Sequence, residues 1–122
     1  MASRAEKMVK TLAVESRVDY YIGVLQRTRS FYEKTLSTGA YPEKLRRDTL
    51  GFIDLVIAKL GRIKALMSRY RFTLQPFYLW EALDEIRNIR FHQEAGAVST
   101  SLARRVGAIV SELEMELRQL AT

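Results

Sequence analysis

STSLARRVGAIVSELEMELRQL, residues 99–120, is the stretch that decides the fold. Its apolar residues recur every three or four positions, at Leu102, Val106, Ile109, Leu113, Leu117 and Leu120. This spacing places them on one face of an α-helix, and Ser99 or Thr100 suits the cap of its N-terminus. The stretch therefore predicts an amphipathic helix that must bury one face against other helices.

Three further helical patterns precede this stretch, over residues 1–36, 45–70 and 76–93. Short breaks separate the four segments, at residues 37–42, 71–76 and 95–99. Gly39 suits the end of the helix before it, while Pro42 and Pro76 suit the first turn of the helix that follows. The chain therefore divides into four helices joined by short connections.

Short breaks between long amphipathic helices make neighbouring helices antiparallel. The chain of 122 residues is long enough to bury one core and too short for two domains. Nothing in it alternates with the period of two that is typical of strands. We therefore expect one all-α domain over residues 1–122, an antiparallel up-and-down bundle of four helices, with residues 1–15 fraying.

Composition excludes several classes of chemistry. The chain has no cysteine, which rules out disulfides, thiolate zinc sites and cysteine nucleophiles, and its single histidine rules out a histidine metal cluster in one chain. Its isolated glycines form no phosphate-binding loop, so we expect no metal or cofactor.

The N-terminus lacks the apolar core of a signal peptide, and no run of about 20 apolar residues occurs. We therefore expect a cytoplasmic protein without a membrane partner.

The net charge of +6, from 20 Lys and Arg against 14 Asp and Glu, favours a polyanionic partner. The excess of basic residues lies in the first two-thirds of the chain. If they line one face, these residues are the expected contacts with nucleic-acid phosphates: Arg46, Arg47, Lys59, Arg62, Lys64, Arg69 and Arg71. The simpler alternative is a solvated helix face.

The only asparagine and the only histidine of the chain fall within one hexapeptide, RNIRFH at residues 87–92. On a helix Asp84, Asn88 and His92 form one polar stripe, because they are spaced four residues apart. Arg87 lies about 140° around the helix from His92. The two converge only if the helix ends or bends near His92, or if a second copy of the chain supplies one of them.

This hexapeptide has the Arg-Asn-x-x-x-His form of the HEPN signature. With Trp80 and Leu83 ahead of it and a closing helix behind it, the chain resembles this family of small α-helical domains over roughly residues 76–120. The resemblance implies a defence-associated homodimer in which arginine and histidine from two protomers cleave RNA without a metal. It implies a general base at His92, a phosphate and transition-state ligand at Arg87 and an orienting residue at Asn88. We expect Asp84, on the same polar stripe, to support them.

A purely structural interpretation of the same residues is equally open. His92 would then lie near a helix C-terminus, where the helix dipole favours a histidine. Arg87 would pair with Asp84 one turn earlier, and Asn88 would be a packing or capping residue. A helical adaptor without a nucleic-acid site is a further class, and it predicts a large exposed apolar patch.

Two weaker resemblances predict a non-catalytic basic subunit of a nucleic-acid complex. Residues 89–96 look like part of the small helical subunits of type III CRISPR effectors, and residues 36–38 ahead of 45–47 resemble the first motif of those subunits. Residues 31–32 followed by 57–70 resemble the helical domain of replicative GINS subunits. Either resemblance implies a protein partner in a defence or replication complex.

Overall fold

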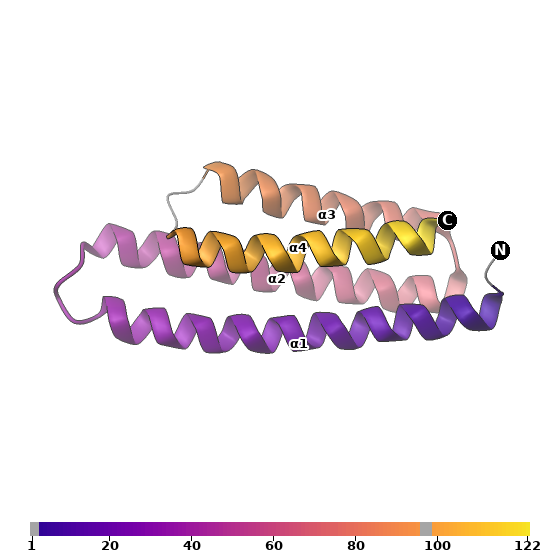
Figure 1. Ribbon diagram of the computed structural model, residues 1–122, viewed down its shortest axis with the longest axis horizontal. Coiled ribbons are helices and arrows are strands. Elements are labelled where there is room, and N and C mark those ends of the chain that lie inside the picture. The colour runs from indigo at the N-terminus through magenta and orange to yellow at the C-terminus, as the bar shows by residue number, and fades with distance from the viewer. Residues whose placement is uncertain (1–2, 96–98) are drawn as a thin grey trace.

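The computed structural model describes residues 3–95 and 99–122, and Figure 1 shows an elongated bundle of helices. In chain order these are α1 (Arg4–Leu36), α2 (Glu43–Thr73), α3 (Pro76–Ala95) and α4 (Thr100–Ala121). Each helix packs against the next, and α4 also packs against α1, so the four close around one core. Consecutive helices run in opposite directions in Figure 1, and no strand occurs in the two described ranges. The predicted all-α fold of four helices is confirmed.

Helix α1 starts earlier than its sequence pattern predicts. Residues 4–15, which we expected to fray, are helical. The side chain of Ser3 caps the helix by accepting a hydrogen bond of 3.1 Å from the backbone N–H of Glu6. Thr11 and Val14 are buried in the bundle. The cap and the burial therefore stabilise the first turns of α1. The irregular apolar spacing of this segment did not predict them.

The first two connections follow from residues with special backbone preferences. Gly39 has a φ of +81°, a conformation that glycine adopts without strain, and Pro42 is the N-cap of α2 rather than a residue of its first turn. Leu74 ends α2 with a φ of 57°, and its N–H donates a 2.7 Å hydrogen bond to the carbonyl of Tyr70. Pro76 then opens α3, where its missing N–H costs nothing.

The core confirms the stripe that predicts α4. All six of its apolar residues are buried, and they belong to one cluster with buried residues of the other three helices. The break predicted at residues 95–99 includes 96–98, which lie outside the described residues. Among the helices that the structure describes, none carries an apolar stretch that could cross a membrane.

Candidate functional site

Arg87 and Asn88 lie on the solvent side of α3. The side chain of Arg87 is 70% exposed, and its Nη1 donates a hydrogen bond of 3.2 Å to Oδ1 of Asp84, one turn earlier. Asn88 is exposed as well. An ion pair on the surface contributes at most about 1 kcal/mol, because water and salt screen both charges. Arg87 can therefore exchange its carboxylate partner for another anion with little loss of free energy.

His92 lies on a different side of the same helix. Helix α3 continues past His92 to Ala95, so the two candidate catalytic side chains stay about 140° apart around its axis. His92 is half-buried, and its ring lies edge-on to Phe91 with 5.6 Å between the ring centres. Within one chain, Arg87 and His92 therefore do not share a site. A second copy of the chain remains the route by which the arrangement expected from the HEPN resemblance could form.

Arg90, in the middle of the hexapeptide, joins α3 to α4. Its guanidinium donates to Oε1 of Glu114 and, at 3.4 Å, to Oγ of Ser111. The hydrogen bond from Arg90, with a further one from Arg118, holds the pKa of Glu114 below its ordinary value, because each favours the charged carboxylate. The second arginine of the hexapeptide therefore serves the fold.

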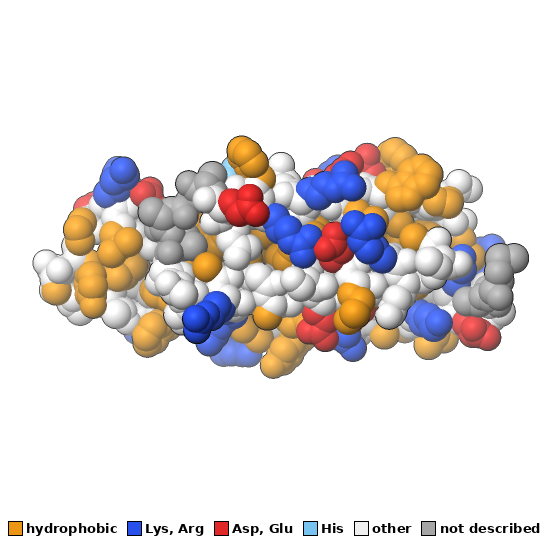
Figure 2. All heavy atoms as spheres, turned by 45° about the horizontal axis from the view of Figure 1, so that its top comes forward, with side chains coloured by type: hydrophobic (Ala, Val, Ile, Leu, Met, Phe, Trp, Pro, Cys, Tyr) orange, Lys and Arg blue, Asp and Glu red, His pale blue; other side chains and the backbone are white. Residues whose placement is uncertain are grey.

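Three large aromatic side chains lie on the same side of α3 as Arg87 and Asn88. Phe77, Trp80 and Phe91 are 58%, 62% and 66% exposed. Around a regular helix these residues fall within an arc of about 100°, and we term the surface they form the α3 outer face: Phe77, Trp80, Asp84, Arg87, Asn88 and Phe91. His92 lies about 40° beyond the edge of this face. Figure 2 shows apolar side chains among charged ones on this side of the bundle. The α3 outer face therefore combines exposed aromatic rings with an exposed guanidinium and an exposed amide.

Most basic residues that we expected to contact nucleic acid form ion pairs within the bundle. Five of the seven have a carboxylate partner: Lys59 and Arg62 with Glu85, Lys64 with Asp19, Arg71 with Glu15, and Arg46 with Glu33 and Glu43. Arg47 and Arg69 are exposed and form no ion pair with the residues that the structure describes. The seven expected contacts therefore do not form a continuous track of unpaired charge.

Glu15 shows that Arg71 of α2 serves the fold. Its carboxylate is buried, and it accepts hydrogen bonds of 2.7 and 3.4 Å from Nε and Nη2 of Arg71. The hydrogen bond to Glu15 raises the pKa of the Arg71 guanidinium. A buried carboxylate without its partner is strongly destabilising. Helical periodicity cannot reveal this pair, because its members are 56 residues apart in the chain.

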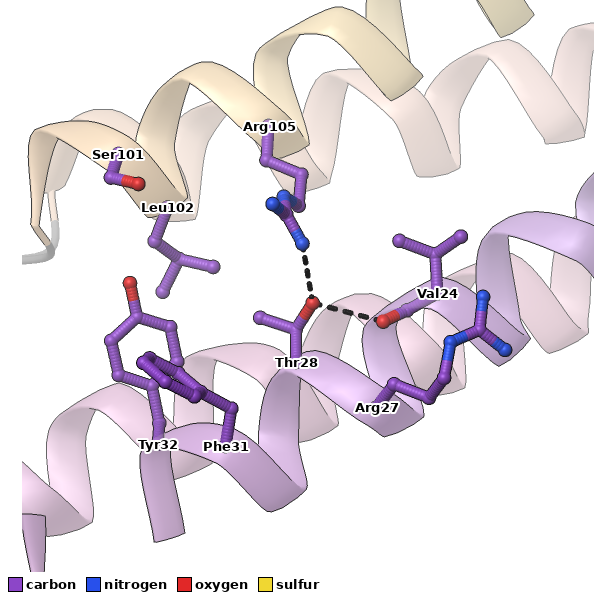
Figure 3. Close-up of a pocket in the computed structure, with 8 residues that line it drawn as sticks. All are labelled: Val24, Arg27, Thr28, Phe31, Tyr32, Ser101, Leu102 and Arg105. Atoms are coloured by element: carbon purple, nitrogen blue, oxygen red, sulfur yellow. Dashed lines mark hydrogen bonds between the residues drawn. The ribbon is translucent and has the colours of Figure 1, made fainter. Parts of the chain in front are cut away.

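A further group of basic residues, which the sequence pattern does not single out, lines a pocket between α1 and α4 (Figure 3). The pocket has a volume of about 340 Å³. Its two arginines, Arg27 and Arg105, form no ion pair within residues 3–95 and 99–122. Arg105 instead donates a hydrogen bond of 2.9 Å to the hydroxyl of Thr28, which is 77 residues away. Only the packing of the two helices brings these side chains together.

In the described part of the chain, no three His, Asp or Glu side chains gather as they would around a metal ion. The chain matches no family model, no curated protein and no solved structure. The resemblances to known families therefore rest on the motif residues alone.

Proposed function

We propose that the protein is a non-catalytic helical subunit that binds single-stranded RNA through the α3 outer face. The observation that carries this proposal is the stripe of exposed Phe77, Trp80 and Phe91 rings on the same face as Arg87 and Asn88. Aromatic rings stack on unpaired bases, and a guanidinium binds phosphate. Such a subunit would act in a larger nucleic-acid complex, as the resemblances to the type III CRISPR small subunits and the GINS scaffold imply.

The α3 outer face combines both contributions that single-stranded nucleic acid needs. It extends from Phe77 to Phe91, which is about 21 Å along a helix. Stacking of one base on an aromatic ring contributes about 1–3 kcal/mol and tolerates any base. The net charge of +6 adds a long-range attraction for the phosphates. We therefore expect binding that depends on salt and little on RNA sequence.

Trp80 makes this proposal directly testable, because it is the only tryptophan of the chain. Titration with a single-stranded oligoribonucleotide should quench its fluorescence as a base stacks on the indole. In anisotropy measurements with labelled RNA, Trp80→Ala and Phe91→Ala should each weaken binding about tenfold. The matched control is Tyr20→Ala, which removes an equally exposed ring from α1. Unchanged affinity in both α3 variants would contradict the proposal and favour a helical adaptor.

The second candidate function is metal-independent RNA cleavage by a homodimer. It is favoured by the accessibility of Arg87 and Asn88 and by the position of His92 beside the α3 outer face. Two copies meeting at this face would place Arg87 of one near His92 of the other. His92 would take the proton of a ribose 2′-hydroxyl, Arg87 would stabilise the phosphate charge and Asn88 would orient either group.

A cleavage assay separates the two candidate functions. The wild-type protein and His92→Ala are incubated with labelled single-stranded RNA in the presence of a chelator, and the oligomeric state is measured on the same samples. Cleavage by a wild-type dimer that is lost in His92→Ala would establish the second candidate. Binding without cleavage would support the non-catalytic subunit.

A further inference from the structure

The pocket between α1 and α4 has a cationic part and an aromatic part. Figure 3 shows Arg105 of α4 above Thr28, with Arg27 on one side along α1 and the rings of Phe31 and Tyr32 on the other. Its remaining lining residues are Val24, Ser101 and Leu102, so no carboxylate lines it. Its volume of about 340 Å³ falls at the lower end of the range for small-molecule sites, roughly 300–1,000 Å³.

The positive charge of the pocket is not neutralised within the described residues. Thr28 is buried and donates its hydroxyl proton to the carbonyl of Val24 at 2.9 Å, so its oxygen accepts from Arg105 as a neutral partner. The guanidinium is thereby held in place while its charge stays available. Ser101, in the first turn of α4, also lines the pocket and lies at its aromatic part (Figure 3).

The aromatic part of the pocket is held in a defined position. The hydroxyl of Tyr32 lies 3.1 Å from Oγ of Ser99, the residue that caps α4. The ring of Phe31 meets that of Tyr32 edge-on, with 5.5 Å between their centres, and Phe31 is 61% exposed. The Phe31 ring is therefore accessible for stacking. Phe31 belongs to α1, the helix that also carries Arg27.

We propose that this pocket binds a nucleoside monophosphate, with the phosphate on Arg105 and Arg27 and the base on Phe31. A phosphate dianion matches two guanidinium groups that have no carboxylate partner among the described residues, and a base matches an exposed ring. The phosphorylated nucleoside can be a free nucleotide or the 5′ end of an RNA chain, since both present a phosphate and a base. This site is separate from the α3 outer face and does not depend on the function proposed for that face.

The test is calorimetric titration of the full chain with adenosine 5′-monophosphate. Wild-type protein should bind it, and Arg105→Gln should lower the affinity at least about tenfold by removing a charged hydrogen-bond donor. The matched control is Arg104→Gln, which removes an exposed charge of the same helix that does not line the pocket. Phe31→Ala should weaken binding of the nucleotide and leave binding of inorganic phosphate unchanged. Thermal unfolding of each variant verifies that it is folded.

Two further arms identify the source of the nucleotide. Competition by an RNA oligonucleotide carrying a 5′-phosphate, but not by one ending in a hydroxyl, would assign the pocket to RNA ends. Nucleotide binding without such competition would assign it to free nucleotides. No binding by the wild-type protein, or an equal loss in Arg104→Gln, would overturn the proposal. RNA binding that depends on Trp80 would survive that result, so failure here and failure of the function proposed above are distinguishable.

Discussion

The two ends of the contact between α1 and α4 use arginine in opposite ways. At one end Arg17 pairs with Glu112 and Glu116, and Tyr21 donates a 2.6 Å hydrogen bond to Glu112. Arg17, Glu112 and Glu116 line a pocket of about 360 Å³, close in size to the pocket at the other end. At that other end, within the described residues, the guanidinium of Arg105 donates a hydrogen bond to a hydroxyl and pairs with no carboxylate. We term the two the paired end and the unpaired end.

The comparison separates charges that hold the helices together from charges that remain available. At the paired end Arg17 is matched by two carboxylates on the facing helix, so an anionic ligand would have to displace an internal partner of this guanidinium. At the unpaired end the partner of Arg105 among the described residues is a neutral hydroxyl, so an anion competes with no carboxylate for the guanidinium. Cavities of similar size between the same two helices therefore differ in whether their arginines have carboxylate partners.

The largest effects should come from the apolar core, and they should be alike at both ends. Leu102 lies at the unpaired end and Leu117 towards the paired end, and both are fully buried. Leu102→Ala and Leu117→Ala should each lower the free energy of unfolding by about 2–5 kcal/mol through lost burial and a cavity. Denaturant unfolding measures this. A loss below about 1 kcal/mol for Leu102→Ala alone would mean that the two ends differ in packing as well as in charge.

An intermediate effect is expected from Tyr21 at the paired end. Burial and the hydrogen bond to Glu112 raise the pKa of Tyr21 to about 12. Because the folded-state pKa exceeds the unfolded value of 10.0, this stabilisation is complete below pH 10 and is lost as pH rises towards 12. Tyr21→Phe should lower the free energy of unfolding by about 1–2 kcal/mol at neutral pH.

The alkaline dependence of unfolding distinguishes this role of Tyr21. Between pH 10 and 12 the stability of Tyr21→Phe should fall less steeply than that of the wild type, because the variant lacks the group that titrates. The matched control is Tyr20→Phe, since Tyr20 is exposed and next to Tyr21 in the chain. Parallel curves for Tyr21→Phe and wild type would contradict the assigned role.

The smallest effects should come from the arginines themselves, and they bear most directly on the comparison. Arg17→Gln breaks ion pairs at the paired end and should cost about 0.5–1 kcal/mol. Arg105→Gln should change the free energy of unfolding by less than about 0.5 kcal/mol, because no carboxylate partner is lost. Urea unfolding at low and high salt measures both. A loss in Arg105→Gln as large as that in Arg17→Gln would show that Arg105 serves the fold.

The candidate site on α3 was partly predictable. The sequence placed Arg87, Asn88 and His92 on one helix and predicted the angle between the first and the last, because these follow from helical geometry. The exposure of Phe91 was not predictable, since an aromatic residue beside Ile89 and His92 suits a core as well as a surface. Its place on the α3 outer face depends on which side of α3 packs against α2 and α4.

The basic residues of α2 show the limit of a linear charge count. Their number predicted a polyanionic partner, yet Lys59, Lys64 and Arg71 are paired with carboxylates of α3 and α1. The sequence pattern does not distinguish Arg27 and Arg105 from other arginines, because single arginines on helical segments are common. The partners of a charge are set by distances across the bundle, which no local pattern encodes.

The sequence by itself determined the all-α class, the number of helices, the buried face of α4 and the absence of thiol chemistry. These depend on periodicity, turn residues and composition, which act over a few residues. Only the tertiary structure decided which arginines are neutralised, which aromatic rings stay exposed and that Thr28 meets Arg105. The physical reason is that burial and Coulomb interactions depend on separation in space, and the packing of the four helices sets that separation.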